Sequence, residues 1–296
     1  MWRPRGPHQP VTIRVAQPMA DRAALQALID DAPLAVLGAQ LGEPPAMPDD
    51  GVAVLAEHAG RVVAALVSSV PIAGSCWLAG AVLRHRGDEA LVGPLSAALR
   101  TALGAHGVDA WFASGDPRRD GWLLRQLVAQ GFVPSTEVVQ YAAPRATPPP
   151  VGVWPLRSAT PADARHIAAI DAASFTPEWR YTDALIAAML GQAAYATIAE
   201  AEGAPIGYAM ATSHGAGRWQ HLVRIAVRPA WQHRGIGAHL FGHWIRRAYA
   251  DGATHLSLNT QADNQRARRL YERCGFALTG ERVVILRSTV PAPVAG

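Results

Sequence analysis

A glycine-rich turn near residue 235 is the first segment whose residues could do chemistry. It stands between an apolar strand-like run, residues 221–227, and an amphipathic helical pattern that continues to about Asp251. Glycine permits a sharp turn and removes the Cβ atoms that would block an anion, so that backbone N–H groups point inward at a helix N-terminus. The turn therefore predicts a pyrophosphate site. Its residues are Gln232, His233, Arg234, Gly235, Ile236, Gly237 and Ala238.

Two polar side chains follow the next predicted strand, residues 254–259. Asn264 and Tyr271 are seven positions apart in a helical pattern. This spacing predicts that an amide and a phenol lie on one helix face, two turns apart, where both can line the same cleft. Gly275 is expected to end the helix as its C-cap.

Other nucleotide-binding motifs do not fit the turn. A dinucleotide-binding turn requires a third small residue where Leu240 stands, and it requires an acidic residue at the end of the following strand. A nucleoside-triphosphate loop requires G-K-[ST] after the glycines, and this is absent.

The motifs V-x-P, Q-x-x-G-x-G, N-x-x-A-x-x-x-Y and G-F, in this order and spacing, resemble the GNAT superfamily of N-acetyltransferases. The resemblance extends from Trp154 to about Arg287. It implies an α/β fold, a mixed and mostly antiparallel sheet flanked by helices, with acetyl-coenzyme A held between two splayed parallel strands.

The resemblance also implies roles for single residues. The backbone of Ala226 and Val227 would pair with the pantetheine amides, and residues 232–238 would hold the pyrophosphate. Asn264 would steady the pantetheine arm. Tyr271 would protonate the departing thiolate of coenzyme A, a role that suits a phenol of high pKa.

The first half of the chain repeats the second. The segment Ile13–Pro18 matches Leu156–Pro161, and the helix that ends in Gly131-Phe132 matches the helix that ends in Gly275-Phe276, 144 residues later. Two similar units at a near-constant offset predict a tandem duplication of the acetyltransferase fold. In the second copy, Thr160 and Asp163 are placed to cap the first helix.

The first copy lacks the residues that carry the chemistry. Leu127 stands where Tyr271 stands in the second copy, and Asp88 and Glu89 fall in the segment that corresponds to the glycine turn, where they would repel a pyrophosphate. We therefore expect a flexible tail at residues 1–10, a degenerate copy at 11–143, a Pro-rich linker at 144–153 and a catalytic domain at 154–290.

The implied reaction is direct attack of a neutral primary amine of a small molecule on the acetyl thioester. Because an alkyl amine is protonated at neutral pH, the reaction needs a base or a water chain. No residue is privileged by sequence, and the aromatic side chains of Trp179, Tyr181 and Trp219 either line the acceptor pocket or belong to the core. The candidate bases are Asp171, Glu178, Asp183, His214 and His221.

Three alternatives stay open. A protein or peptide N-terminal acetyltransferase is one, although enzymes that acetylate a ribosomal protein carry a glutamate base where this chain has Asn259. A non-catalytic acyl-coenzyme A sensor is the second, and the retention of Tyr271 counts against it. A nucleic-acid or protein-binding module that uses the basic helix is the third, and steep salt dependence would identify it.

Composition sets the remaining expectations. The chain has 50% hydrophobic and 17% charged residues, as a packed globular protein does, and its net charge of +4 is too small to indicate nucleic-acid binding. The two cysteines, Cys76 and Cys274, are too few for a disulfide framework and predict a reducing cytoplasm. We expect no signal peptide, no membrane span, no metal and no nucleic-acid partner, and leave a homodimer open.

Arginines gather near the predicted pyrophosphate turn. They form either a solvated helix face or a surface from which one or two meet the 3′-phosphate of coenzyme A. These residues are Arg246, Arg247, Arg266, Arg268, Arg269 and Arg273.

Overall fold

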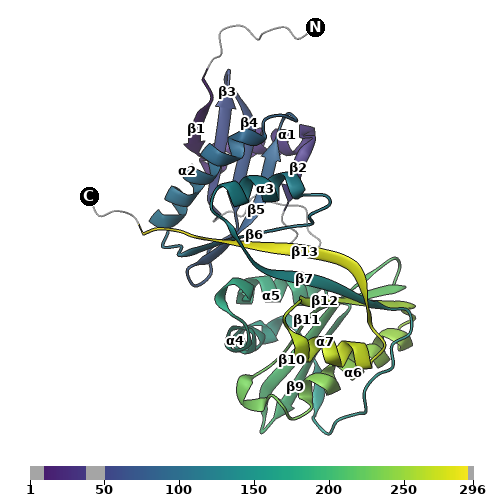
Figure 1. The fold of residues 1–296 in the computed structure, drawn as a ribbon. Coiled ribbons are helices and arrows are strands. Elements are labelled where there is room, and N and C mark those ends of the chain that lie inside the picture. The colour runs from purple at the N-terminus through teal and green to yellow at the C-terminus, as the bar shows by residue number, and fades with distance from the viewer. Residues whose placement is uncertain (1–9, 38–50, 293–296) are drawn as a thin grey trace. The chain divides into compact units, whose positions relative to one another are not determined.

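The computed structural model describes residues 10–37 and 51–292, so residues 1–9 of the predicted tail lie outside the described residues. The chain divides into two compact units (Figure 1). Unit 1 comprises Met1–Ser135 together with Val283–Gly296, and unit 2 comprises Thr136–Arg282. Each unit is a mixed, mostly antiparallel sheet with helices on both faces, as predicted.

Unit 1 orders its strands β1-β3-β4-β5-β6-β13, and β2 pairs with β5 off this path. Helix α1 packs on one face, against β4 and β5, while α2 packs on the other, against β3 and β4. Its elements are β1 (Thr12–Val15), α1 (Pro18–Asp31), β2 (Leu34–Leu37), β3 (Ala53–His58), β4 (Arg61–Ser68), β5 (Ser75–Leu83), α2 (Val92–Ala105), β6 (Ala110–Gly115) and α3 (Gly121–Ala129).

Unit 2 orders its strands β7-β12-β11-β10-β9-β8. Helices α4 and α5 cover one face, and α6 and α7 cover the other. Its elements are β8 (Leu156–Ser158), α4 (Ala164–Ser174), α5 (Asp183–Gln192), β9 (Tyr195–Ala201), β10 (Ala204–His214), β11 (Trp219–Val227), α6 (Ile236–Ala250), β12 (His255–Gln261) and α7 (Gln265–Arg273). Strands β7 (Val133–Ala143) and β13 (Ala277–Thr289) each run from one unit into the other.

Local sequence signals explain where the helices of unit 2 begin and end. Asp163 Oδ2 accepts a hydrogen bond from the Thr160 backbone N–H at 2.9 Å, which confirms the predicted cap before α4. Buried apolar residues recur along α6 at helical spacing, as in Ile236, Leu240 and Trp244. After α7, Gly275 has a φ of +88° and ends the helix one residue beyond Cys274, so the expected glycine stop is present.

The two units exchange a strand. In unit 2, β7 pairs antiparallel with β12, with Ala143 opposite Leu256. In unit 1, β13 pairs antiparallel with β6, with Arg287 opposite Phe112. Residues 143 and 287, like 112 and 256, are 144 positions apart, so the two ladders have the same register.

This exchange corrects the predicted boundaries. Residues 136–143 belong to unit 2 and residues 283–290 belong to unit 1, whereas the sequence assigned them to the opposite copies. Because β7 and β13 are copies of one strand, each fits the partner of the other, and a repeat in the sequence does not reveal which pairing is used.

The Pro-rich segment is also not a free spacer. Residues 144–153 lie along unit 2, where Thr147 N–H donates to Cys274 O at 2.8 Å and Gly152 N–H donates to His239 Nδ1 at 2.8 Å. A Cβ at Gly242 of α6 would lie 3.0 Å from Pro149, so the segment packs closely on this helix. The segment still has exposed side chains, and Val153 is 91% exposed.

An ion-pair network repeats in both units and supports the duplication. Arg14 contacts Asp21 and Glu57 in unit 1, each at 2.6 Å. Arg157 contacts Asp163 at 2.8 Å and Glu200 at 2.7 Å in unit 2. In each copy the arginine of the first strand therefore fastens the start of the first helix to a neighbouring strand.

Candidate functional site

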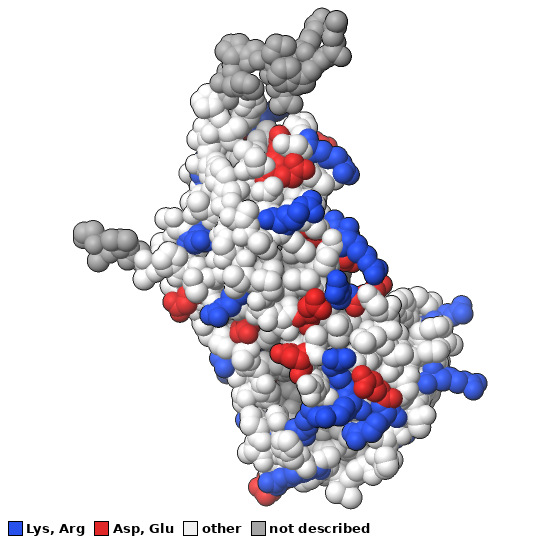
Figure 2. Space-filling model, in the orientation of Figure 1, with Lys and Arg blue, Asp and Glu red and all other residues white. Residues whose placement is uncertain are grey.

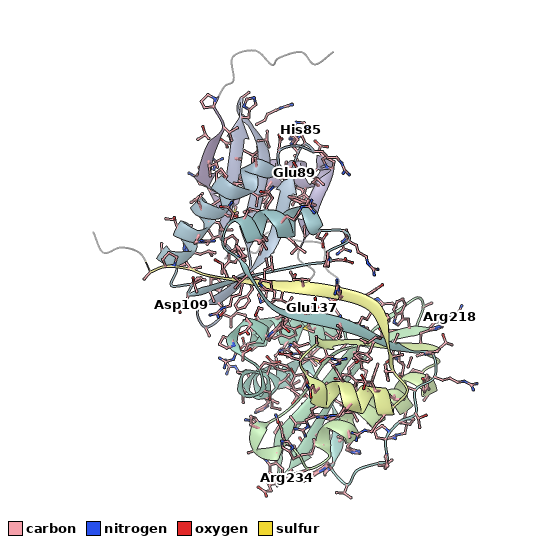
Figure 3. The ribbon with its side chains drawn as sticks, viewed as in Figure 1. His85, Glu89, Asp109, Glu137, Arg218 and Arg234 are labelled. Atoms are coloured by element: carbon pink, nitrogen blue, oxygen red, sulfur yellow. The ribbon has the colours of Figure 1, made fainter. Side chains whose placement is uncertain are left out.

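The predicted pyrophosphate turn lies between β11 and α6, at one edge of unit 2, where Figure 3 labels Arg234. Gly235 precedes the first residue of α6 and has a φ of +79°, and His233 also has a positive φ, of +65°. Gly237 does not need glycine's backbone freedom; it provides space, since a Cβ there would meet only Val227 Cγ2, at 3.9 Å. The first N–H groups of α6 have no intrahelical acceptor and are available to an anion.

Side chains of the turn hold it in place. Gln232 Nε2 donates to Val227 O at 3.0 Å, so this side chain fastens the turn to the end of β11. Arg234 lies over the Trp231 ring, 4.7 Å from its centroid. Arg266 Nη1 donates to His233 Nε2 at 3.2 Å, which brings a second guanidinium to the turn. Ile236 is buried at 1% exposure and anchors the helix start in the core.

A gap opens between β11 and β12 beside this turn. The two strands are parallel, and they pair only where Trp219–Leu222 of β11 lies beside His255–Leu258 of β12. No described segment pairs with β11 beyond Leu222 on that side. The predicted pair of splayed parallel strands is therefore present in unit 2.

The hydrogen-bond pattern between β10 and β11 shows which backbone groups of β11 face the gap. Arg228 N–H donates to Ile206 O at 2.8 Å. Because consecutive residues of an antiparallel strand turn their backbone groups to opposite sides, Val227 faces the gap and Ala226 faces β10. The Val227 carbonyl already accepts from Gln232 and from Ser174 Oγ, at 3.2 Å for the latter, so its N–H is the group left for a ligand.

The equivalent gap of unit 1 is filled by the chain itself. Strands β5 and β6 pair in parallel over Ser75–Trp77 and Ala110–Phe112 and then diverge, as in unit 2. The remaining edge of β5 pairs with β2, with Leu34 opposite Leu83. Leu83 precedes Val227 by 144 residues, so β2 occupies the edge that is open in unit 2. Glu89, which Figure 3 labels, begins a short 3₁₀ helix directly before α2.

Tyr271 combines a buried ring with an accessible hydroxyl. The residue is 5% exposed, and its ring packs against Phe241, Phe276 and Tyr141, with centroid distances of 5.0, 6.5 and 6.2 Å. The hydroxyl has no hydrogen-bond partner among the described residues, and it is not among their buried unpaired atoms, so it reaches solvent. Burial raises the pKa of Tyr271, and the phenol therefore carries its proton at neutral pH.

Asn264 stands directly before α7 and not within it, as the helical pattern had suggested. It is the N-cap of α7, and its Oδ1 accepts a hydrogen bond from Ala267 N–H at 3.2 Å. The residue is exposed at the helix start, whereas Tyr271 lies in the core. An asparagine before a helix satisfies its free N–H groups, and this competing preference decided its place.

A buried ion pair fixes the segment between α4 and α5. Asp171 is fully buried and accepts hydrogen bonds from Arg224 Nε at 2.8 Å, Tyr208 OH at 2.5 Å and Tyr181 N–H at 2.9 Å. Arg224 also donates to Trp179 O, and its guanidinium lies 3.7 Å from the Phe175 ring centroid and 4.0 Å from that of Tyr181. Asp171 is therefore a structural partner and not a free base.

The other candidate bases differ in their surroundings. His214 is exposed at the end of β10 and bonds Thr212 Oγ1 at 3.0 Å. Asp183 starts α5 and accepts from Ala184 N–H at 2.9 Å. His221 is partly exposed, and its Nδ1 lies 2.8 Å from Ser257 Oγ. Burial is the main cause, and the nearby His214 a smaller one, that lowers the pKa of His221 to about 4.

Sequence reasoning missed two residues here. In the sequence, Arg224 is one of several arginines, but in the structure it is buried and pairs with Asp171 of α4. Its alternation with apolar residues along β11 is the pattern from which its burial could have been predicted. Ser257 is fully buried and contacts both Trp219 Nε1 and His221 Nδ1 at 2.8 Å, and no motif marks it. Trp219 is 48% exposed, so it is not the core aromatic that the sequence allowed.

Charges on the described surface are mixed. Acidic and basic residues lie side by side on the face in Figure 2. Of the arginines near the turn, Arg268 is bound to Tyr141 OH at 2.9 Å and Arg247 to Asp251 at 3.0 Å. Residues 10–37 and 51–292 contain no cluster of ligands for a metal ion, and none of their helices is long and apolar enough to cross a bilayer.

Comparison with known families and structures identifies relatives of this arrangement. Residues 163–276 match the model of the Acetyltransferase (GNAT) family. The matched segment contains the turn, the splayed strands and Tyr271. No curated protein matches the chain.

Three solved structures share the fold over almost the whole chain. A GCN5-related N-acetyltransferase from Sphaerobacter thermophilus is 20% identical, with a TM-score of 0.57, and the match covers 97% of this chain and 98% of that one. A tandem GNAT protein from the clavulanic acid biosynthesis pathway is 17% identical, with a TM-score of 0.59 and coverage of 97% and 100%. A GNAT-family acetyltransferase from Colwellia psychrerythraea is 12% identical, with a TM-score of 0.52 and coverage of 95% and 100%.

Proposed function

We propose that this chain transfers an acetyl group from acetyl-coenzyme A to a primary amine of a small molecule, because residues 163–276 match the model of the GNAT acetyltransferase family. The observation that supports the proposal is the combination, found among the described residues in unit 2 and not in unit 1, of an open strand gap, a glycine turn at a helix start and a phenol without a hydrogen-bond partner on a buried ring.

The residues present fit acetyl-coenzyme A. The N–H groups at the start of α6 suit a pyrophosphate, and the glycine at 237 leaves the space that a phosphate needs. The Val227 N–H faces the gap and suits a pantetheine carbonyl. Arg234 and Arg266 bring positive charge to the turn and suit the phosphates. The thioester of this co-substrate supplies an activated acetyl group.

Tyr271 acts as the general acid in this proposal. The amine must lose a proton before it attacks the carbonyl carbon, and this proton passes to solvent through water. As the C–N bond forms and the C–S bond breaks, Tyr271 gives its proton to the sulfur. The second proton that the nitrogen loses returns to the phenolate. One proton is released per turnover, and the phenol is restored.

Turnover with a panel of acceptors tests the proposal. Free thiol would be measured with acetyl-coenzyme A and small amines, aminoglycosides or peptides as acceptors. The chain contains no lysine, so acetylation of the protein itself is confined to its N-terminus and gives little background. Turnover with a small amine is expected.

Other outcomes identify the alternatives. Turnover with peptides alone would assign a protein N-terminal acetyltransferase. Tight binding of acetyl-coenzyme A by calorimetry without turnover on any acceptor would assign a sensor. Absence of binding would reject the proposal.

A further inference from the structure

The face of the unit 2 sheet that carries α4 and α5 contains a short polar chain. A bulge at Val223 adds one residue to β11, because Met210 lies opposite Arg224 while Ala211 lies opposite Leu222. Leu222 consequently packs in the core beneath α6, and His221 turns to the other face, where Arg224 meets α4. Ser257 lies beside His221 in the register of β11 and β12.

Three side chains are connected by hydrogen bonds on this face. Ser257 Oγ lies 2.8 Å from Trp219 Nε1 and 2.8 Å from His221 Nδ1. An indole N–H only donates, so the first bond runs from Trp219 to Ser257. Ser257 is fully buried, and its own proton also needs an acceptor.

The direction of the second bond follows from what surrounds Ser257. Among the described residues, His221 Nδ1 is its one acceptor. The hydroxyl therefore donates to Nδ1, and this nitrogen carries no proton. A neutral imidazole with a bare Nδ1 carries its proton on Nε2.

The Nε2–H group of His221 is free to meet a ligand. Nε2 has no partner among the described residues and is not among their buried unpaired atoms, so it reaches solvent. The titratable neighbour from β10 is His214, and its charge acts with burial to keep the imidazole neutral, with a pKa of about 4. His221 is thus an uncharged hydrogen-bond donor at neutral pH.

We propose that His221 binds the acceptor substrate by donating a hydrogen bond from Nε2–H, and that it is not the base that deprotonates the amine. The proposal rests on the proposed function. His221 lies one residue before the point where β11 and β12 part, next to the gap in which the thioester would lie. The acceptor therefore carries an oxygen or nitrogen with a free lone pair, such as a hydroxyl, ether or carbonyl oxygen, close to the amine that is acetylated.

Two substitutions separate a donor from a base. His221→Gln keeps an N–H group but cannot take up a proton, whereas His221→Leu supplies neither function. For a donor, His221→Gln should stay within about threefold of the wild-type kcat/KM, and His221→Leu should raise the KM of the acceptor by about tenfold with little change in kcat. His166→Gln, at an exposed histidine of α4, is the matched control.

A base would behave differently. If both His221 variants lost kcat by ~10²–10⁴-fold, the proposal would be wrong and His221 would be the base. A normal acceptor KM in His221→Leu would also overturn it, because the contact would then contribute nothing to binding.

The tautomer itself can be measured without turnover. Nitrogen-15 NMR of the wild-type protein should show His221 with Nε2 protonated and Nδ1 bare from about pH 5 to pH 8, and Ser257→Ala should abolish this preference. A proton on Nδ1 would refute the proposal even in an active enzyme. If Nε2–H were observed but no amine were acetylated, the proposed function would be wrong, and the proposed recognition of the acceptor would be wrong with it. The hydrogen-bonded chain of Trp219, Ser257 and His221 would still be confirmed.

Discussion

At the scale of single residues, the chemistry that we propose for unit 2 rests on Tyr271, which is only 5% exposed. Aromatic rings surround its own ring, and the hydroxyl has no hydrogen-bond partner among the described residues. Burial raises the pKa of the phenol. A phenol that stays protonated at neutral pH is available as a general acid when the C–S bond breaks.

Replacing Tyr271 with Phe should therefore lower kcat by ~10²–10⁴-fold with little change in acetyl-coenzyme A affinity, because the ring stays and the proton is lost. Steady-state kinetics and calorimetry measure the two effects. Tyr195→Phe is the control, since its hydroxyl bonds His243 at 2.8 Å, away from the gap. Retention of more than about half of the rate, with chemistry limiting, would show that Tyr271 only packs.

Gly237 offers a second test at this scale. Valine at 237 should abolish acetyl-coenzyme A binding and leave the fold intact, because a Cβ there meets the protein only at 3.9 Å but intrudes where the pyrophosphate is expected. Calorimetry and circular dichroism measure both properties. Gly191→Val is the matched control, at a glycine with nothing within 4 Å of its Cβ. Unchanged binding in a folded Gly237→Val variant would reject the turn as the phosphate site.

At the scale of elements, the Arg224–Asp171 pair connects β11 to α4 and to the segment before α5. The contacts join the strand that faces the gap to the loop that would shape the acceptor site. Both charges are almost completely removed from water, at 8% and 0% side-chain exposure. Each depends on the other, because a lone buried charge is strongly unfavourable.

Arg224→Met should accordingly destabilise the protein by about 3–5 kcal/mol, because Asp171 is left buried without its partner. Adding Asp171→Asn should recover part of this loss, since the remaining group is neutral. Urea unfolding of the two variants and the wild type gives the comparison. If the Arg224→Met variant alone were as stable to urea as the wild type, the pair would contribute nothing to the free energy of unfolding.

The sequence predicted the elements better than their partners. The motifs located β11, α6, β12 and the stop after α7, because glycines, caps and apolar periodicity are local signals. They did not reveal that Asn264 caps α7, that Arg224 is buried or that β2 pairs with β5. Those facts depend on which distant segment lies alongside, and local pattern does not contain this information.

At the scale of the whole molecule, two copies of one fold differ in whether their gap is open. In unit 1, β2 provides the β5 edge with the backbone partners that a pantetheine would otherwise supply, and Asp88 and Glu89 stand before α2. Leu127, fully buried, stands at the position equivalent to Tyr271. The fold is present twice, and the edge that is open in unit 2 is paired with β2 in unit 1.

Titration of acetyl-coenzyme A into the full chain should therefore saturate at one equivalent. Two carboxylates at the turn repel the phosphates, and β2 already occupies the strand edge. Isothermal calorimetry measures the number of acetyl-coenzyme A molecules bound per chain, and the Gly237→Val substitution should reduce this number to zero. A second equivalent that survives this substitution would place a working site in unit 1.

The exchange of β7 and β13 means that neither half of the chain is a separable piece. A fragment of residues 154–290 lacks the strand that pairs with β12, and a fragment of residues 1–153 lacks the one that pairs with β6. A protease site inserted at the exposed Val151–Val153 should therefore cut the backbone without releasing the parts, which would elute together under native conditions and separate only in denaturant. Separation of the cut halves in native buffer would contradict the exchange. The two halves of the chain are therefore joined by the peptide backbone and also by the hydrogen bonds of the exchanged strands.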